Sequence, residues 1–348
     1  MITKPTLLID EKKCRSNIRM MAEKARKHSL KFRPHFKTHQ LHEVGRWFRE
    51  EGVSTITVSS LDMAKFFAQD GWDNITVAFP VNVLEIDTIN ELAQKITLNL
   101  LVESEEAVTI LAKGLTQSVN LFIKIDIGTH RTGIDPTNRE EIRKLVQIIE
   151  SSDKMKWLGF LAHAGHSYQA RGEKEILVIH EDCMAQLASL RNSFDDYPDL
   201  IISYGDTPTC SIADSFPAID ELRPGNFAFY DLDQLTIGAC SQEHIAVAMA
   251  CPVVAKHPER EELIIYGGGV HFSKDKMNHF GQVVADSELG WGRIQEDVIL
   301  AKLSQEHGTI SAPKDWINKT EIGDILKVLP IHSCLTMDLM RHFGWEII

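Results

Sequence analysis

Residues 97–126, TLNLLVESEEAVTILAKGLTQSVNLFIKID, contain two short apolar runs separated by an amphipathic stretch of helical period. The runs Thr97–Val102 and Leu121–Asp126 predict buried strands, and Ser104–Lys113 predicts a helix between them. Ser104 can cap this helix, and the acidic residues that follow it suit the positive end of the helix dipole. A strand, a helix and a second strand in this order predict a βαβ unit with parallel strands.

The same alternation extends over most of the chain. An opening strand at Leu7–Asp10 and a helix around Arg15–His28 precede eight strand candidates, which is the number that a (β/α)8 barrel needs. These candidates are Lys31–Pro34, Thr55–Val58, Ile75–Phe79, Thr97–Val102, Leu121–Asp126, Leu158–His163, Leu200–Tyr204 and Glu221–Arg223. Helical patterns such as Leu61–Asp70, which Ser60 can cap, lie between them. The prediction is an α/β fold with a (β/α)8 TIM-type barrel, and the alternative is an open doubly wound sheet.

The pattern changes near Leu232, where β-rich segments such as Ile245–Lys256 and Glu262–Val270 replace the helical period. We therefore expect a barrel over residues 11–231 and a second, mainly β C-terminal domain over residues 232–348, which strand 1–10 could join. Within this domain, Gly267-Gly268-Gly269 is either a turn or a point of close approach, and the turn is favoured.

Composition indicates an ordinary globular protein with a small ligand. The 348 residues are 43% hydrophobic and carry a formal net charge of −12, which disfavours binding to nucleic acid or to anionic membranes. No apolar run is long enough to span a bilayer, and the N-terminus does not resemble a signal peptide, so a cytoplasmic protein is expected. The six cysteines are scattered without a C-x-x-C pair, which argues against a disulfide framework.

Lys37 is the most distinctive candidate residue. It lies in Arg33-Pro34-His35-Phe36-Lys37-Thr38-His39, where the first barrel strand ends, and functional residues of barrel enzymes lie at such strand ends. Burial and the neighbouring basic residues are expected to favour the neutral amine, which can form an imine with a carbonyl compound. A lone lysine is usually solvated, and only this context favours a functional role.

Two loops could bind a phosphate group. Gly205-Asp206-Thr207-Pro208-Thr209 follows the seventh predicted strand, and Gly225-Asn226 follows the eighth. The loops after these two strands are the usual phosphate site of a barrel enzyme. Each loop alone is also an ordinary turn sequence, so the pairing is the informative feature.

These motifs resemble the fold-type III pyridoxal phosphate family, in the branch of metal-dependent D-serine dehydratase and D-threonine aldolase. The resemblance implies that Lys37 is the Schiff-base lysine that holds pyridoxal 5′-phosphate. It also implies that Arg131, in Asp126-Ile127-Gly128 to Arg131-Thr132-Gly133, lies near the phenolic oxygen of the cofactor. By the same resemblance, His163 packs against the pyridine ring.

Further roles follow from the same resemblance. Arg223 is similar to an arginine that faces the ring nitrogen in alanine racemases. Thr207, with the backbone of Gly225 and Asn226, is implied to hold the phosphate, and Tyr168 to line the substrate pocket. We therefore expect Lys37, His35 and Tyr168 to be catalytic and Gly205 to contribute to cofactor binding.

His332-Ser333-Cys334 is a separate candidate metal motif. If this segment is extended, side chains two residues apart point to the same side, so an imidazole and a thiolate could bind one Zn²⁺ and leave positions open for substrate. An isolated H-x-C is usually without function. Here, however, His332-Ser333-Cys334-Leu335-Thr336 resembles the His-x-Cys-x-Thr segment that binds zinc in D-serine dehydratases. Asp338 could add a carboxylate, although a solvated role is expected.

Together these features predict a homodimeric lyase that uses pyridoxal 5′-phosphate and Zn²⁺ or another divalent metal. Its expected substrates are D-β-hydroxy amino acids. Dehydration to keto acid and ammonia is preferred to aldol cleavage. An amino-acid racemase of the alanine racemase type is the alternative enzyme, and a noncatalytic pyridoxal phosphate carrier is the alternative from another class.

Overall fold

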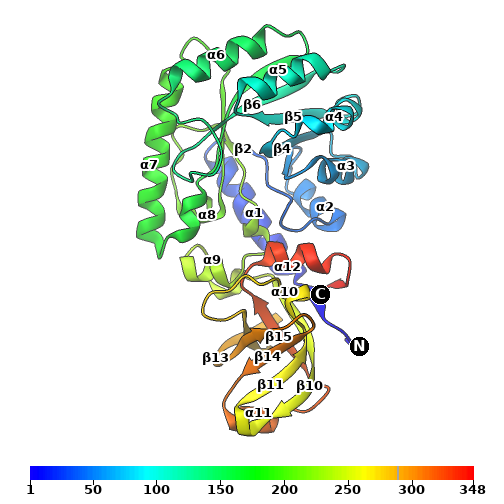
Figure 1. Cartoon of the computed structure of the whole chain (residues 1–348). Helices are drawn as coiled ribbons and strands as arrows, with labels where there is room; N and C mark the ends of the chain where they lie inside the picture. Colours follow the sequence, from blue (N-terminus) through cyan, green and yellow to red (C-terminus); the bar gives the residue numbers. More distant parts are fainter. Residues whose placement is uncertain (288–289) are drawn as a thin grey trace. The chain divides into compact units, whose positions relative to one another are not determined.

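The computed structural model describes residues 1–287 and 290–348, and these residues form two compact units (Figure 1). The barrel unit comprises residues 19–37 and 42–225. The β unit comprises residues 1–18, 38–41 and 226–348. The boundary between them crosses helix α1 (Glu11–Lys27).

The barrel unit contains the predicted parallel strands. Within the described residues, one eight-stranded sheet has the order β2-β9-β8-β7-β6-β5-β4-β3. Its strands are β2 (Lys31–Phe32), β3 (Ile56–Val58), β4 (Asn74–Pro80), β5 (Thr97–Val102), β6 (Val119–Ile125), β7 (Met155–Ala162), β8 (Ile201–Tyr204) and β9 (Glu221–Leu222). A parallel bridge between His35 and Thr57 joins the end of β2 to β3 and closes the ring. The predicted (β/α)8 barrel is confirmed, and the open sheet is not found.

Helices alternate with these strands and cover the outside of the barrel. They are α2 (His42–Glu50), α3 (Leu61–Gln69), α4 (Ile86–Ala93), α5 (Glu105–Gly114), α6 (Arg139–Glu150), α7 (Glu173–Asn192) and α8 (Thr207–Ile212), with the short 3₁₀ helices η1 (Val83–Glu85) and η2 (Gly165–Gln169). The predicted caps are confirmed: Ser60 Oγ accepts the Met63 N–H, and Ser104 Oγ accepts the Ala107 N–H.

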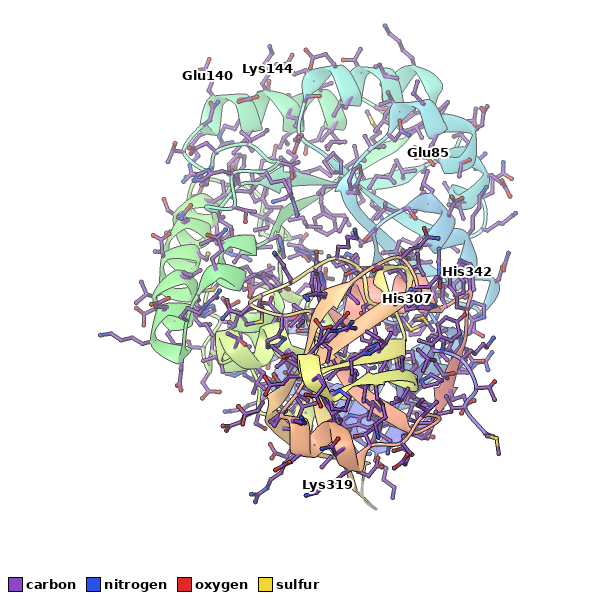
Figure 2. All side chains as sticks on the ribbon, turned by 60° about the horizontal axis from the view of Figure 1, so that its bottom comes forward. Glu85, Glu140, Lys144, His307, Lys319 and His342 are labelled. Atoms are coloured by element: carbon purple, nitrogen blue, oxygen red, sulfur yellow. The ribbon has the colours of Figure 1, made fainter. Side chains whose placement is uncertain are left out.

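The helical layer carries charged side chains on its outer face, whereas the strands that it covers are buried. On α6, Glu140 and Lys144 point away from the barrel (Figure 2). The Lys144 amine pairs with Glu105 of α5 at 2.7 Å. The side chains of β5 from Leu98 to Val102 are at most 2% exposed, because helices cover one face of a parallel strand and the barrel interior covers the other.

The β unit is built on a second sheet. Within the described ranges, its eight strands have the order β11-β14-β13-β12-β15-β10-β1-β16. They are β1 (Thr6–Ile9), β10 (Val247–His257), β11 (Glu262–Tyr266), β12 (Gly281–Ser287), β13 (Gly290–Leu303), β14 (His307–Ser311), β15 (Ile325–Pro330) and β16 (Trp345–Ile347). β1 runs antiparallel to β10 and parallel to β16. The two ends of the chain therefore lie side by side in one sheet.

Short helices connect these strands. They are α9 (Leu232–Ile237), α10 (Gly269–Phe272), α11 (Lys314–Lys319) and α12 (Ser333–Met340), with the 3₁₀ helices η3 (Asn226–Ala228), η4 (Gln242–His244) and η5 (Pro258–Arg260). None of the helices in the described ranges is both long enough and apolar enough to cross a membrane.

Two local predictions in the β unit are wrong. At Gly268 a Cβ would lie 2.3 Å from the Gln305 carbonyl oxygen, and at Gly267 it would lie 2.6 Å from Cys251 Sγ, so these glycines permit close packing rather than form a simple turn. The second error concerns His332-Ser333-Cys334, which is not an extended segment. His332 is the extended N-cap residue of α12, and Cys334 already belongs to the helix.

Candidate functional site

The end of β2 aims Lys37 into the barrel mouth. Phe36 is fully buried, and its ring lies 5.0 Å from Phe48, 4.9 Å from Phe67 and 5.1 Å from Trp72. Residues 36–39 form a turn directly after the bridge residue His35, and the packing of Phe36 in this aromatic cluster anchors that turn. His35 and Lys37 both line a cavity of about 330 Å³.

This cavity is strongly cationic. The basic side chains that line it are His35, Lys37, Lys124, Arg131, His163 and Arg223, and no carboxylate is among its described lining residues. Its remaining walls include the apolar residues Ala78, Phe79, Pro80, Leu101 and Leu161. A pocket of this size and charge suits a small ligand with more than one anionic group.

The buried lysine of the cavity is Lys124 and not Lys37. Lys37 is exposed, so the burial expected around its amine is not found. Lys124 is only 5% exposed, and its Nζ donates to the Ile125 carbonyl oxygen at 2.6 Å. Burial, with the nearby charges of Arg223 and Arg131, lowers the pKa of Lys124 to about 7. The sequence offered a signal for this residue, because it is the charged residue of the mainly apolar strand β6.

His163 is held as a neutral imidazole. Its Nδ1 lies 2.5 Å from the Gly205 carbonyl oxygen, which can only accept, so Nδ1 carries the proton. Burial lowers the pKa of His163 to about 3, and the charges of Lys37, Lys124 and Arg223 act in the same direction. Part of the ring remains accessible from the cavity, and an uncharged ring there suits contact with a flat aromatic ligand.

Asp126 organises the loop that carries Arg131. The Asp126 carboxylate accepts the backbone N–H groups of Gly128, Thr129 and His130 at 3.0–3.1 Å. The Gly128 and His130 donors hold the pKa of Asp126 below its usual value despite its partial burial. Thr129 Oγ1 in turn donates to the His163 carbonyl oxygen at 2.8 Å, which ties this loop to the end of β7.

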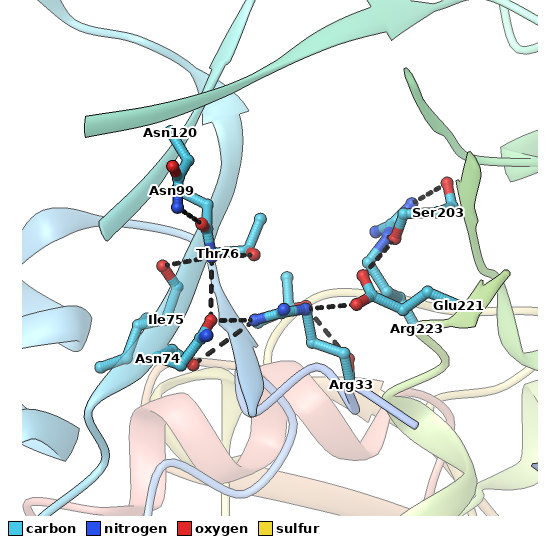
Figure 3. Close-up of polar contacts among 10 residues, drawn as sticks. Arg33, Asn74, Ile75, Thr76, Asn99, Asn120, Ser203, Glu221 and Arg223 are labelled. Carbon is cyan, nitrogen blue, oxygen red and sulfur yellow. Dashed lines mark hydrogen bonds and ion pairs between the residues drawn. The ribbon is translucent and has the colours of Figure 1, made fainter. Parts of the chain in front are cut away.

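Arg223 is held at the cavity wall by a chain of buried polar side chains (Figure 3). Its Nε donates to Ser203 Oγ at 2.6 Å, and Ser203 Oγ donates to Glu221 Oε1 at 2.6 Å. Glu221 Oε2 accepts from Arg33 Nε at 2.7 Å. All four side chains are at most 4% exposed. Arg33 therefore pairs with Glu221 inside the barrel.

This series of hydrogen-bonded side chains continues from Arg33 across the barrel interior. Arg33 Nη1 donates to Asn74 Oδ1 at 2.8 Å, Asn99 Nδ2 donates to the same oxygen at 3.1 Å, and Asn120 Nδ2 donates to Asn99 Oδ1 at 2.8 Å (Figure 3). Arg223 Nη2 donates to the Ala162 carbonyl oxygen at 2.5 Å. No hydrogen bond within the described residues uses Arg223 Nη1, so this donor is left for a group in the cavity. Burial lowers the pKa of Arg223 to about 10, so it stays charged at neutral pH.

The loop after β8 contains an unsatisfied buried hydroxyl. Thr207 is fully buried, and its Oγ1 has no hydrogen-bond partner within the described part of the chain. A buried hydroxyl without a partner is costly, and a phosphate oxygen would satisfy it. The Thr207 N–H donates to the Tyr168 hydroxyl at 3.2 Å. Gly205 is required here, because a Cβ would lie 2.6 Å from the Arg223 carbonyl carbon.

The predicted metal residues come together in the β unit. The His332 ring and the Cys334 thiol are close enough to interact, and His332 Nδ1 lies 2.8 Å from Asp275 Oδ2. Burial alone would lower the pKa of His332, but the hydrogen bond and charge of Cys334, the charge of Asp231 and the hydrogen bond with Asp275 raise it to about 10. The predicted pairing of imidazole and thiol is therefore present, although a helix start and not an extended segment creates it.

Polar neighbours surround the Cys334 sulfur. Cys334 is 8% exposed, its Sγ donates to Thr38 Oγ1 at 3.3 Å, and Asn226 Nδ2 donates to Sγ at 3.5 Å. Asp231 fixes this arrangement by accepting from Asn226 Nδ2 at 2.6 Å and from the Ser333 N–H at 2.9 Å. Thr38 directly follows Lys37 in the chain, so the segment that carries the cavity lysine continues into a residue that contacts this sulfur.

Only some of the predicted site residues share one cavity. His35, Lys37, Arg131, His163 and Arg223 line it together. Tyr168, Gly205, Thr207 and Gly225 are not among its lining residues, although all four belong to the barrel unit. Asn226, His332 and Cys334 lie in the β unit, and Asp338 is bound by Gln40 instead, at 2.9 Å. Sequence reasoning missed Lys124, Ser203 and Glu221 and assigned no role to Asp275.

The fold and the cavity together indicate the class of protein. The barrel has an exposed lysine and a neutral histidine in a cationic cavity whose described lining contains no carboxylate, and a buried threonine hydroxyl without a partner lies in the loop after β8. Such a barrel is suited to hold a small, anionic, aromatic cofactor. Comparison with known families agrees. Residues 9–233 match the alanine racemase N-terminal domain, and residues 246–344 match a putative serine dehydratase domain. The chain belongs to the fold-type III pyridoxal phosphate family, with an alanine racemase N-terminal domain followed by a serine dehydratase domain, which confirms the predicted resemblance.

Similar proteins cover nearly the whole chain. A D-serine dehydratase of Dictyostelium discoideum is 30% identical over 97% of this chain and 92% of its own length. The structure of D-threo-3-hydroxyaspartate dehydratase from Delftia sp. HT23 is 26% identical and has a TM-score of 0.90, covering 97% of this chain and 93% of that one. A variant of the latter enzyme with a cysteine replaced by alanine has been solved in the metal-free form, at 25% identity, a TM-score of 0.88 and the same coverage. A D-threonine aldolase of Arthrobacter is 21% identical over 99% of this chain and 88% of its own length.

Proposed function

We propose that this protein is a lyase that uses pyridoxal 5′-phosphate and a divalent metal and acts on D-β-hydroxy amino acids, with dehydration preferred to aldol cleavage. The observation that carries the proposal is the presence, in one chain, of a cationic cavity with Lys37 and of the paired side chains His332 and Cys334. A racemase needs no metal pair of this kind. A noncatalytic carrier would need neither that pair nor the serine dehydratase domain.

The barrel residues fit the cofactor. Lys37 would attach it covalently, the Thr207 hydroxyl and the backbone of Gly225 would bind the phosphate, and Arg223 Nη1 would donate to the ring nitrogen. Bound there, pyridoxal 5′-phosphate supplies an electron sink that weakens the bonds to the substrate Cα. Asn226 completes the proposed phosphate site through its backbone, and Gly205 leaves the room that this loop needs.

The other cavity residues have distinct tasks. Neutral His163 can stack against the ring without adding charge, and Arg131 can donate to the phenolic oxygen. The Lys37 amine lines the cavity and would serve as the base that removes the substrate Cα proton. His35 is expected to assist this transfer, because its Nδ1 accepts the Lys37 backbone N–H at 3.3 Å and fixes the segment. Tyr168 is expected to line the substrate path and to support the Thr207 loop.

His332 and Cys334 would hold a metal that assists loss of the substrate's β-hydroxyl group. Imidazole and thiolate are preferred ligands of Zn²⁺, and a pair of them leaves coordination positions open. A metal held there would supply Lewis-acid assistance to a departing hydroxide, which is a poor leaving group at neutral pH. The overall reaction converts D-serine to pyruvate and ammonia.

We also propose a cytoplasmic homodimer. In the single chain Lys37 is exposed and Phe79 on the cavity wall is 60% exposed, and a second subunit could cover both. Sedimentation should show a dimer, and an active monomer would contradict this part.

The decisive experiment measures keto acid, ammonia and aldehyde from D-serine, D-threonine and D-3-hydroxyaspartate, with and without a chelator. Keto acid and ammonia are expected from at least one substrate, with loss after chelation and recovery with Zn²⁺. Keto acid formation at an unchanged rate in metal-free enzyme would reject the metal-dependent lyase. Formation of the L-enantiomer alone would favour the racemase.

Covalent attachment is tested separately. Reduction with borohydride followed by peptide mapping should place the cofactor on Lys37, with Lys124 as the internal control because it is a second amine in the same cavity. Label on the Lys124 peptide would overturn the assignment of Lys37.

A further inference from the structure

Asp275 is the one carboxylate that the described residues place in hydrogen-bond contact with the His332 ring. Its Oδ2 lies 2.8 Å from His332 Nδ1. A carboxylate in this position can only accept, so Nδ1 carries a proton, and Nε2 is the nitrogen that can give up its proton to bind a metal. A metal-binding histidine needs such a free nitrogen, and its tautomer is set by the partner of the other nitrogen.

The two arms of the His332–Cys334 pair are supported differently. The Cys334 arm is fixed by buried polar groups, since Thr38 and Asn226 contact its sulfur and Asp231 is 1% exposed. The His332 side chain is 39% exposed and belongs to the N-cap residue of α12, so part of it borders solvent. Besides its contact with Cys334, the His332 ring is restrained by the hydrogen bond to Asp275.

We propose that Asp275 is a positioning residue that fixes the ring orientation and tautomer of His332, so that Nε2 faces a divalent metal shared with Cys334. This inference rests on the metal site in the proposed function. It goes beyond that site by assigning a residue that does not itself bind the metal. A carboxylate that orients a metal-binding histidine is commonly worth about 10- to 100-fold in metal affinity.

If Asp275 only stabilised the fold, its replacement would lower the unfolding temperature. The Asp275 side chain is 48% exposed, and ion pairs at such exposure contribute little to folding stability. The Asp275→Ala variant should therefore fold as the wild type does and lose metal affinity. Asp338 is the matched control, because its side chain is 50% exposed, it also lies in the β unit, and its carboxylate contacts Gln40 and Arg341 instead of His332.

The experiment uses the full-length protein with its cofactor, stripped of metal and titrated with Zn²⁺ against a chromophoric chelator. Asp275→Ala should bind Zn²⁺ about 10- to 100-fold more weakly, and Asp275→Asn, which keeps an acceptor oxygen, should recover most of this loss. Asp338→Ala should match the wild type. The unfolding temperature of the metal-free protein should not change in any of the three variants.

A spectroscopic measurement separates positioning from direct ligation. At saturating Co²⁺, the thiolate-to-metal charge-transfer band should persist in Asp275→Ala, because Cys334 still binds. Wild-type affinity in Asp275→Ala, or a defect in Asp275→Asn as large as that in Asp275→Ala, would overturn the inference. Normal Zn²⁺ affinity in Cys334→Ala would instead reject the metal site of the proposed function, so the two failures are distinguishable.

Discussion

Replacing Glu221 by glutamine tests the buried polar chain that holds Arg223. Glu221 is 1% exposed and accepts two hydrogen bonds, one from Arg33 Nε at 2.7 Å and one from Ser203 Oγ at 2.6 Å. The substitution removes the charge and leaves Arg33, which is 3% exposed, as a buried cation without a counterion. Breaking a buried pair in this way costs about 3–5 kcal/mol.

This free energy gives an expected shift in unfolding temperature. The barrel unit contains about 200 residues, and at that size 1 kcal/mol corresponds to about 2–4 °C. Glu221→Gln should therefore lower the unfolding temperature of the barrel by about 6–20 °C, measured by calorimetry. Asn74 Oδ1 still accepts from Arg33, which favours the lower part of this range.

Two control variants test whether the loss of stability comes from the unpaired buried charge. Asp196→Asn makes the same chemical change at an exposed pair with Arg143 and should cost about 1 kcal/mol or less. Replacing both buried partners, by Arg33→Met with Glu221→Leu, should cost much less than Glu221→Gln, because no buried charge is left unpaired. An unfolding temperature for Glu221→Gln equal to that of wild type would refute the reasoning.

Three further predictions concern the loops and the metal pair. Gly205→Ala places a Cβ 2.6 Å from the Arg223 carbonyl carbon, so cofactor affinity, measured by fluorescence titration, should fall roughly 5- to 100-fold, and unchanged affinity would contradict this. Burial raises the pKa of Asp206 to about 6, so the protonated side chain contributes stability below about pH 4, and this contribution is lost as the pH rises through 6. In urea unfolding, the free energy of unfolding of the wild type should fall by about 3 kcal/mol between pH 4 and 6 relative to that of Asp206→Asn. The same pH dependence in both proteins would reject the shift. Cys334→Ala should abolish bound zinc by elemental analysis but keep the cofactor absorbance, and full zinc occupancy would rule out this ligand.

Local patterns in the sequence predicted much of the barrel. The eight strands and the helix caps at Ser60 and Ser104 depend on hydrophobic period and on side chains within three residues of one another. Lys37 was found because it follows a strand end, and it lines the cavity in the structure, where the buried Phe36 beside it anchors the turn.

The sequence did not reveal contacts between distant residues. Arg33 and Glu221 are 188 positions apart, His332 and Asp275 are 57 apart, and no period relates either pair. The start of α12 also differs from the extended segment expected, because Asp231, about 100 residues earlier, binds the Ser333 N–H and fixes the first turn. The sequence by itself determined the barrel, its family and the candidate lysine, since these depend on neighbouring residues. Only the tertiary structure decided which charges pair and which lysine is buried, because pKa and pairing depend on the groups that folding brings together.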